Sequence, residues 1–183
     1  MTDEDRLYER VLVLRCQTGD EAAFAELVER YQPRLRYYLR KMLRDPQGAD
    51  DALQDVWLDV FRSVSRLADA GAFRGWVYRV AHDRAVRRLR RHGPLCRCPE
   101  ELDAVDGRTD EAEFTAEDAA RVHAALDELT AEHREALVLR YLEDMAYEEI
   151  ARVVGCPVGT VRSRLHHAKR ALRAVLERMN LHD

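Results

Sequence analysis

Apolar residues recur every three to four positions along most of the chain, which is the pattern of one-sided helices rather than of strands. The clearest example is the series Phe24, Leu27, Val28, Tyr31, Leu35, Tyr38, Leu39 and Met42. Gly19 and Asp20 supply a start for this helix, with Asp20 as N-cap, while Pro33 predicts a kink or a restart within it. Glycine (8) and proline (5) are few among 183 residues, and no alternating runs indicate strands. The sequence therefore predicts an all-α fold.

Charge is distributed in blocks that divide the chain. Residues 74–91 carry seven arginines against a single Asp83, and residues 100–118 are strongly acidic. Between these blocks, Gly93, Pro94 and Pro99 end any helix. From residue 152 the chain is basic again. The sequence therefore predicts two small helical domains, residues 1–92 and 117–183, joined by a flexible acidic linker at 93–116.

Further helices are expected in both predicted domains. In the first, one helix follows residues 45–48 and another covers about 73–91. The apolar residues of the first of these helices are Leu53, Val56, Trp57, Val60, Phe61 and Val64. Those expected to face inward from the second are Trp76, Val77, Val80, Ala81, Val86 and Leu89. The second domain is expected to contain helices at 119–129, 131–141, 147–154 and 158–179.

The last two of these helices form a predicted helix-turn-helix, joined by the short segment Gly155–Pro157. One stripe of the final helix is apolar and is expected to pack inward: Val161, Leu165, Ala168, Leu172 and Val175. The polar residues that then project outward are Arg162, Ser163, His166, His167 and Arg170. Arginine can bridge the O6 and N7 atoms of guanine, so this face fits a DNA groove. A solvated basic face on a helical hairpin is the alternative.

An acidic strip marks the helix that follows residues 45–48. Its members on or near one face are Asp51, Gln54, Asp55, Leu58 and Asp59. Such a strip suits docking against a basic partner, or simple solvation. The net charge of the whole chain is -4, so any binding of nucleic acid has to rest on local basic surfaces.

Two sets of motifs resemble those of bacterial extracytoplasmic-function (ECF) sigma factors, in the order of that family. Residues 19–27, 51–58 and 73–81 resemble sigma region 2, and residues 130–173 resemble sigma region 4. The resemblance implies a sigma factor that binds core RNA polymerase and directs promoter-specific transcription initiation through the minus-10 and minus-35 elements. The alternative is a helix-turn-helix transcriptional regulator that binds duplex DNA without a sigma role.

The resemblance also implies roles for individual residues. In the minus-35 duplex, Arg162, Ser163, His166 and His167 are expected to face bases, and Lys169 and Arg170 to face phosphates. For the melted minus-10 strand the expected residues are Phe73, Arg74, Tyr78, Arg79, Asp83, Arg84, Arg87 and Arg88. Tyr78 and the loop at 70–74 are expected to offer pockets or stacking surfaces for bases, and the arginines to hold the backbone. The acidic strip, Asp51, Gln54, Asp55, Leu58 and Asp59, is expected to dock on the polymerase.

The chain departs from the family pattern at four positions. The family usually has arginine where this chain has His167, and serine or threonine where it has Ala146. The Ala146 departure removes a capping hydroxyl, at a cost of about 1 kcal/mol. The family commonly has asparagine in place of Asp83, which accepts hydrogen bonds but cannot donate them, so base preference can differ. Arg87 stands where aspartate is common, which allows a charge-swapped pair.

No catalytic constellation, cofactor motif or phosphate-binding glycine loop occurs, so the sequence predicts a protein that is not an enzyme and needs no cofactor. Cys16, Cys96, Cys98 and Cys156 form no paired framework, and the chain begins without a signal peptide or membrane span, so we expect a cytoplasmic protein with reduced thiols and no direct membrane insertion. His92, Cys96 and Cys98 could bind zinc or sense oxidation, but a structureless linker is favoured and no metal site is assigned. An anti-sigma factor partner is expected from the family.

Overall fold

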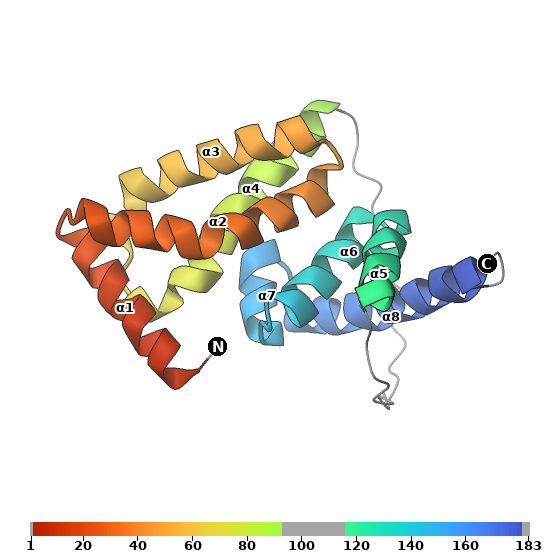
Figure 1. The fold of residues 1–183 in the computed structure, drawn as a ribbon. Helices are drawn as coiled ribbons and strands as arrows, with labels where there is room; N and C mark the ends of the chain where they lie inside the picture. Colours follow the sequence, from red (N-terminus) through yellow and green to blue (C-terminus); the bar gives the residue numbers. More distant parts are fainter. Residues whose placement is uncertain (1, 93–115, 181–183) are drawn as a thin grey trace. The chain divides into compact units, whose positions relative to one another are not determined.

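The computed structural model describes residues 2–92 and 116–180, with side chains described at 2–90 and 120–179. Every regular element within these ranges is helical, which confirms the predicted all-α fold (Figure 1). The chain divides into two compact units, the first containing α1–α4 and the second most of α5–α8. Residues 93–115, with Cys96 and Cys98, and the side chain of His92 lie outside the described part.

The first unit consists of α1 (Asp3–Gln17), α2 (Glu21–Leu43), α3 (Pro46–Ser63) and α4 (Phe73–His92). Two short 3-10 turns, η1 (Val64–Arg66) and η2 (Ala70–Ala72), connect α3 to α4. Asp20 is the N-cap of α2 as predicted, because its carboxylate accepts a hydrogen bond from the Ala23 N–H at 3.1 Å. The predicted break at Pro33 is wrong, since α2 is continuous through it. Tyr31 and Leu35 are buried on either side of the exposed Pro33, and their packing holds the helix together.

Helix α1 was not predicted, although its first residues form a capping box. The Thr2 hydroxyl accepts from the Asp5 N–H at 3.2 Å, and the Asp5 carboxylate accepts from the Thr2 N–H at 3.0 Å. Farther along, the buried carboxylate of Glu9 accepts a hydrogen bond from the Tyr31 hydroxyl at 2.5 Å. This contact joins α1 to α2, and burial beside Glu9 raises the pKa of Tyr31. A charged residue therefore belongs to the core here, which the apolar pattern alone does not reveal.

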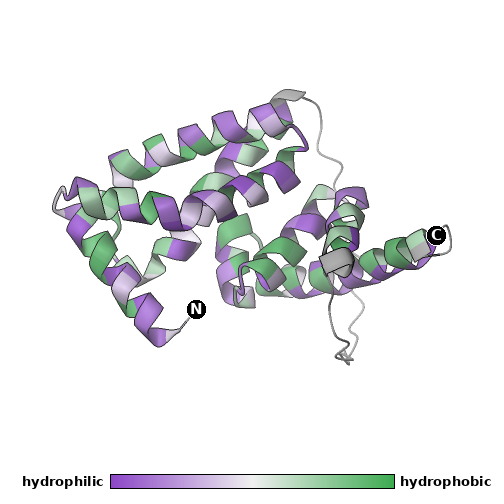
Figure 2. Cartoon of the chain, in the orientation of Figure 1, coloured by the Kyte–Doolittle hydropathy of each residue, from purple (hydrophilic) through white to green (hydrophobic). Residues whose placement is uncertain are grey.

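The core of the first unit forms where α2, α3 and α4 pack together, and each helix has a hydrophobic and a hydrophilic side (Figure 2). Aromatic side chains meet edge to face at its centre: Tyr31 with Phe73 at 5.3 Å, and Tyr38 with Tyr78 at 5.5 Å between ring centroids. All four of these residues are buried. Large aromatic surfaces of this kind contribute much of the packing energy of a small domain.

The inward face of α4 differs from the predicted one. The buried residues of this helix are Phe73, Arg74, Val77, Tyr78, Ala81 and Ala85. Trp76, Val80, Val86 and Leu89, which were expected to face inward, are only partly buried. The buried stripe is therefore rotated towards Tyr78, because this ring packs on Tyr38 of α2.

Helix α3 is attached to α2 by charge as well as by apolar contact. Asp50 lies 3.1 Å from Nε of Arg36 and 3.4 Å from an Nη atom of Arg40. Phe24 of α2 contacts the rings of Trp57 and Phe61 edge to face. Phe61 belongs to the apolar residues predicted for this helix, yet 61% of this residue is exposed even though its ring edge touches Phe24. Helix α3 thus keeps an apolar side chain at its surface.

The second unit consists of α5 (Ala116–Glu128), α6 (Ala131–Leu137), η3 (Val138–Leu142), α7 (Tyr147–Val154) and α8 (Val158–Asn180). These helices match the four predicted ones, except that the predicted helix 131–141 changes at Val138 into η3, a π-helical turn. Thr130 caps α6 by accepting a hydrogen bond from the His133 N–H. None of the helices in the described ranges combines the length and the apolar character needed to cross a bilayer.

Candidate functional site

Helices α7 and α8 are joined by a tight turn that begins at Gly155. Gly155 has φ +70°, a left-handed conformation that favours glycine, and it ends α7. On α8, Val161, Leu165, Ala168 and Val175 are buried, as the predicted apolar stripe requires, whereas Leu172 of the same stripe is only partly buried. The second unit therefore contains the two-helix arrangement that the sequence predicts, with the opposite side of α8 turned away from its core.

The start of α7 carries half of a capping box. The Glu149 carboxylate accepts a hydrogen bond from the Ala146 N–H at 2.9 Å. Ala146 occupies the N-cap position, but its methyl group provides no oxygen for the N–H groups of the first turn. The structure therefore lacks the N-cap hydrogen bond from a side-chain hydroxyl at position 146, as the sequence predicts.

Most residues predicted for minus-35 recognition lie on the outer side of α8. Arg162, Lys169 and Arg170 are exposed, and His166 and His167 are partly exposed with their rings 5.4 Å apart, edge to face. Nζ of Lys169 lies 5.4 Å from the centroid of the exposed Tyr141 ring. The positively charged side chains on this side of α8 are therefore exposed, so an anionic ligand can reach them without any change in the packing of the unit.

Ser163 does not project outward as predicted. It is buried, with 8% of its surface exposed, and its hydroxyl donates to the Thr160 carbonyl at 3.1 Å. Serine in a helix commonly bonds the carbonyl one turn back, and such a bond competes with any external partner. In this conformation the Ser163 hydroxyl is already occupied within its own helix.

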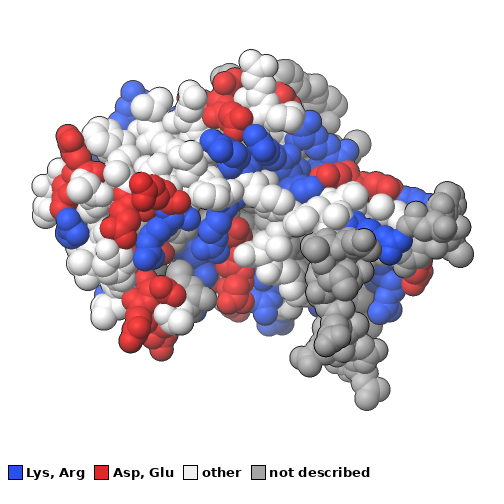
Figure 3. Space-filling view, viewed as in Figure 1, with Lys and Arg blue, Asp and Glu red and all other residues white. Residues whose placement is uncertain are grey.

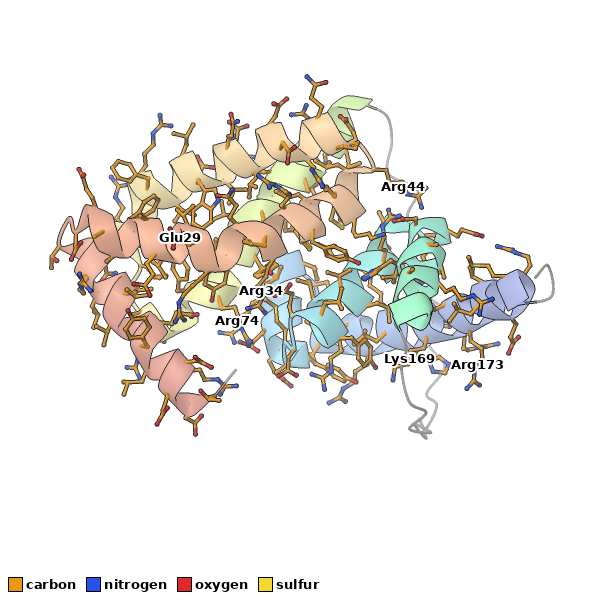
Figure 4. All side chains as sticks on the ribbon, in the orientation of Figure 1. Glu29, Arg34, Arg44, Arg74, Lys169 and Arg173 are labelled. Carbon is orange, nitrogen blue, oxygen red and sulfur yellow. The ribbon has the colours of Figure 1, made fainter. Side chains whose placement is uncertain are left out.

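Arg173 extends the basic side of α8 and was missed by the sequence reasoning. It is exposed and lies one turn beyond Lys169, and the two side chains project from the same side of the helix (Figure 4). The i, i+4 spacing of the two residues was the signal available in the sequence. Arg164, in contrast, lies on another side of α8 and is 3.7 Å from Glu132 of α6.

His133 lies on α6, close enough to α8 for two charged residues of that helix to change its pKa. Burial lowers the pKa of His133, and the positive charges of His167 and Arg164 lower it further. The imidazole therefore remains neutral to lower pH than an exposed histidine.

Three of the residues predicted to hold the minus-10 strand belong to the core of the first unit. Phe73 and Tyr78 are fully buried, and Arg74 is 8% exposed. The expectation that Tyr78 and Phe73 offer stacking surfaces is wrong in this structure, because both rings pack on aromatic residues of α2. Aromatic residues suit a packed core as well as a stacking platform, and the sequence alone did not separate the two uses.

Three of the remaining predicted minus-10 residues, Asp83, Arg84 and Arg87, line a groove of about 390 Å³ between the end of α3 and α4, whereas Arg79 and Arg88 are not among its lining residues. Its lining residues are Asp59, Arg62, Ser63, Arg66, Trp76, Val80, Asp83, Arg84 and Arg87. Trp76 is partly buried and tilted against Phe73, with 5.9 Å between ring centroids. Arg62 and Arg66 were not predicted, although their i, i+4 spacing directly after the acidic strip marks them. The groove combines an indole with several guanidinium groups, a composition that suits a nucleotide.

Asp83 lines this groove and forms an ion pair with a residue of its own helix. One carboxylate oxygen is 3.4 Å from Nε of Arg79, four residues earlier. The predicted charge-swapped pair of Arg87 is not among the ion pairs of the described residues. Arg87 is exposed and lines both the main groove and a smaller neighbouring hollow.

The acidic strip of α3 and the basic residues of α4 are in contact. Asp51 lies 3.2 Å from Arg88, while Arg84 lies 3.5 Å from Asp55 and 2.5 Å from Asp59. The Arg84 Nε–H also donates to Asp59 at 2.7 Å, and this bond raises the pKa of Arg84. The sequence predicted two separate surfaces, whereas the fold joins them along one edge.

Other residues on or near the acidic strip are exposed to solvent. Gln54 is exposed, and Leu58 and Phe61 are 51% and 61% exposed on neighbouring turns of α3. Over the first unit, acidic and basic groups are interspersed on the face seen in Figure 3 rather than separated into areas of one sign. Helix α3 therefore presents an acidic and apolar surface, which we call the α3 face: Asp51, Gln54, Asp55, Leu58 and Phe61.

Each of the two units matches the model of a known protein family. Residues 27–94 match the model of sigma-70 region 2, and residues 119–172 match the model of sigma-70 region 4. The chain is 34% identical over 181 residues to the RNA polymerase sigma-H factor of Pseudomonas aeruginosa, covering 91% of this chain and 92% of that protein. The chain belongs to the ECF sigma factor family. Two further relatives of this sigma factor carry the ECF name.

One of these relatives is the ECF RNA polymerase sigma-E factor of Escherichia coli, 31% identical over 183 residues, with 92% of this sigma factor and 94% of the relative covered. The other is the ECF RNA polymerase sigma factor SigE of Mycolicibacterium smegmatis, 35% identical over 167 residues. In that comparison 87% of this sigma factor and 65% of SigE are covered. The similarity spans both units, which an isolated helix-turn-helix regulator would not explain.

Solved structures share the fold of this sigma factor. CnrH, in a complex with the cytosolic domain of CnrY, gives a TM-score of 0.67 at 24% identity and covers 92% of this chain and 97% of CnrH. RpoE from Bartonella quintana, in a complex with the anti-sigma factor NepR, gives 0.65 at 19% identity and covers 84% and 96%. The sigma factor role predicted from the sequence is confirmed by the family, whose members act as non-enzymatic initiation factors that bind core RNA polymerase and promoter DNA.

Proposed function

We propose that this sigma factor divides its work between the two units. The first unit, with residues 1–92, docks on core RNA polymerase through the α3 face and holds the minus-10 strand along the groove between α3 and α4. The second unit, with residues 117–183, reads the minus-35 duplex with the outer side of α8. The single observation that carries this proposal is the exposure of Leu58 and Phe61 beside the carboxylates of α3.

The α3 face suits a protein partner better than solvent. Two large apolar side chains three residues apart lie next to each other on a helix surface, and a folded unit that acted alone would gain by burying them. Asp51 and Asp55 keep 57% and 52% of their side chains exposed, so a basic partner can reach them. Apolar anchors with charged neighbours are the usual composition of a protein interface.

The groove of the first unit suits a single strand. Arg87 is exposed at its edge, Arg62 and Arg66 line it, and Trp76 supplies an aromatic surface. Cations that follow a backbone, together with an aromatic ring that stacks on a base, are what single-stranded binding requires. Because Tyr78 is buried, Trp76 takes the stacking role in this proposal, and Asp83 is the acceptor that a base edge would meet.

The outer side of α8 suits duplex DNA. Arg162 lies in the first turns of α8 and is exposed, where an arginine can reach a guanine edge. Lys169, Arg170 and Arg173 lie farther along the helix and fit phosphates, which position the helix without reading sequence. His166 and His167 lie between these two groups and complete the base-facing set.

An inhibitory protein partner is also proposed. The solved relatives CnrH and RpoE are each bound to another protein, which for RpoE is the anti-sigma factor NepR. In this chain, Leu7, Val11 and Leu14 form an exposed apolar row on α1, and Tyr141 and Leu142 are exposed in the second unit. Exposed apolar surface of this kind is typical of a site that binds another protein, here an inhibitor.

Run-off transcription tests the proposed function. Purified core polymerase is supplied with a linear template carrying a cognate promoter selected from a promoter library, with and without the chain. We expect specific transcripts only when both proteins are present. Duplex binding by the chain without any gain in initiation would overturn the proposal in favour of a regulator without a sigma role.

A further inference from the structure

Two adjacent histidines lie on the side of α8 that carries its exposed cations. His166 and His167 are both partly exposed, and their ring centroids are 5.4 Å apart. Arg162, His166 and Arg170 are spaced by four residues, so they follow one another along the same side of the helix. Histidine is the side chain that ordinarily changes its charge between about pH 5 and about pH 8. This side of α8 therefore combines imidazole groups with permanent positive charges.

The two imidazoles differ in how well they can accept a proton. Nε2 of His166 is shielded from solvent and has no hydrogen-bond partner among the described residues. An imidazolium carries a hydrogen on both ring nitrogens, so protonation of His166 would leave a buried N–H donor without an acceptor. A buried donor of this kind is unfavourable. Neither ring nitrogen of His167 is such an atom, so His167 is the better proton acceptor of the two.

The charged groups near His167 come from α8 itself and from α6. Arg164 and Arg170 lie three residues to either side of His167, and Glu132 of α6 lies 3.7 Å from Arg164. Burial lowers the pKa of His133 on α6, and the positive charges of His167 and Arg164 lower it further. His133 therefore stays neutral when His167 is charged, and the added proton belongs to the imidazole on the outer helix.

Protonation of His167 adds charge to a surface that already carries several positive charges. Lys169 is exposed beside the ring of Tyr141 in η3, and farther along α8 Arg178 pairs with Glu128 of α5. Positive neighbours oppose an imidazolium in the free chain, whereas DNA phosphates placed against this side favour it. An imidazolium donates hydrogen bonds from both nitrogens, either to a phosphate or to the O6 or N7 acceptor of guanine.

We infer that His167 is a charge-dependent DNA contact, and that the second unit takes up a proton at this residue when it binds duplex DNA. Linkage then requires duplex affinity to rise as pH falls, because the protonated chain is the form that DNA prefers. The inference rests on the proposed function, since it assigns the outer side of α8 to the minus-35 duplex.

Duplex affinity measured against pH tests this inference. The full chain is titrated into a fluorescein-labelled duplex selected for binding from a randomised library, at fixed ionic strength and between about pH 8 and about pH 5.5. We expect the affinity of the unaltered chain to rise roughly fivefold over this range. At the acidic end, the plot of log affinity against log salt should be steeper by up to about 0.9, the contribution of one additional cation.

Two substitutions of the same residue separate charge from packing. His167→Gln keeps a polar side chain that cannot be protonated, so we expect low affinity at every pH and no rise. His167→Arg carries a permanent charge, so we expect high affinity throughout the range, again without a rise. The matched control is His123→Gln on α5, which removes an imidazole of the same unit from another helix and should keep the full rise.

The outcomes of this experiment are distinct. A rise that persists in His167→Gln would overturn the inference, and so would loss of the rise in His123→Gln or in His166→Gln, which would place the proton on another histidine. Far-ultraviolet circular dichroism at both ends of the pH range checks that each variant is folded. Duplex binding without a rise that depends on His167 overturns the inference alone. Failure to bind any duplex of the library overturns the proposed function of the second unit.

Discussion

Helices α4 and α8 are both basic, but they use their charges differently. On α4, Arg79, Arg84 and Arg88 are paired with carboxylates of the same unit. On α8, Arg162, Lys169 and Arg170 are exposed and form no ion pair with the described carboxylates. A phosphate approaching α4 therefore competes with internal partners, whereas one approaching α8 does not. Two basic runs of similar composition thus differ in how readily they are available to DNA.

The burial of aromatic residues on α4 gives the largest predicted effect. Tyr78→Ala removes a fully buried ring that packs on Tyr38, and we expect the free energy of unfolding to fall by about 3–5 kcal/mol. Urea unfolding followed by circular dichroism measures this loss. Tyr78→Phe keeps the packed ring and serves as the control, with a loss well below that of the alanine variant. An unchanged midpoint for Tyr78→Ala, with weaker strand binding, would restore Tyr78 as a stacking residue.

The exposed arginine of α8 gives the next largest effect. Arg162→Ala should weaken binding of a selected minus-35 duplex by about 1–3 kcal/mol and relax preference at one base position. Arg170→Ala is the comparison, because loss of a phosphate contact weakens all duplexes similarly and reduces the salt dependence. Fluorescence anisotropy against cognate and scrambled duplexes distinguishes the two results. Equal losses on both duplexes for Arg162→Ala would remove it from the base-facing set.

The missing cap of α7 can be restored. Ala146→Ser places a hydroxyl at the N-cap while Glu149 already accepts the Ala146 N–H, so the second unit should gain about 1 kcal/mol. In a unit of this size such a gain raises Tm by roughly 4–8 °C, which calorimetry measures. Ala146→Val provides no oxygen and should give no gain. A stabilisation by valine equal to that by serine would assign the effect to packing rather than to capping.

The smallest effect concerns His133 and pH. Because burial and nearby positive charge lower its pKa in the folded chain, the unfolded chain binds the proton more readily. Its contribution to stability is therefore complete above the unfolded pKa of about 6.5 and is lost as pH falls through the lower folded value. Stability measured from neutral to acidic pH should fall less steeply in His133→Gln. A variant with the same pH dependence as the unaltered chain would contradict this assignment.

The sequence predicted the helices well where one apolar stripe dominates. The bounds of α7 and the N-cap at Asp20 follow from local chemistry, and local chemistry is present in the sequence. Helix α1 was missed because buried Glu9 and its many charged neighbours weaken the apolar pattern. The helix-breaking effect of Pro33 was overestimated, because the packing of its neighbours keeps α2 continuous.

The candidate site was predicted less completely, because its decisive features join separate helices. A pattern within α4 indicates a basic helix but does not say that Arg84 and Arg88 meet α3. The same limit applies to Tyr78 and Phe61, whose burial and exposure depend on the neighbour that each ring finds. Ser163 shows the local version of this limit, since a helical hydroxyl can bond its own backbone instead of a partner.

The central claim is that docking and duplex reading lie on different surfaces, the α3 face and the outer side of α8. Binding of the full chain to core polymerase and to a selected minus-35 duplex should be measured for Asp55→Arg and Arg162→Ala, with Glu29→Arg as a charge-reversal control outside both surfaces. We expect Asp55→Arg to lose core binding and keep duplex binding, and Arg162→Ala to do the reverse. Unchanged core affinity in Asp55→Arg would contradict the assignment of the α3 face.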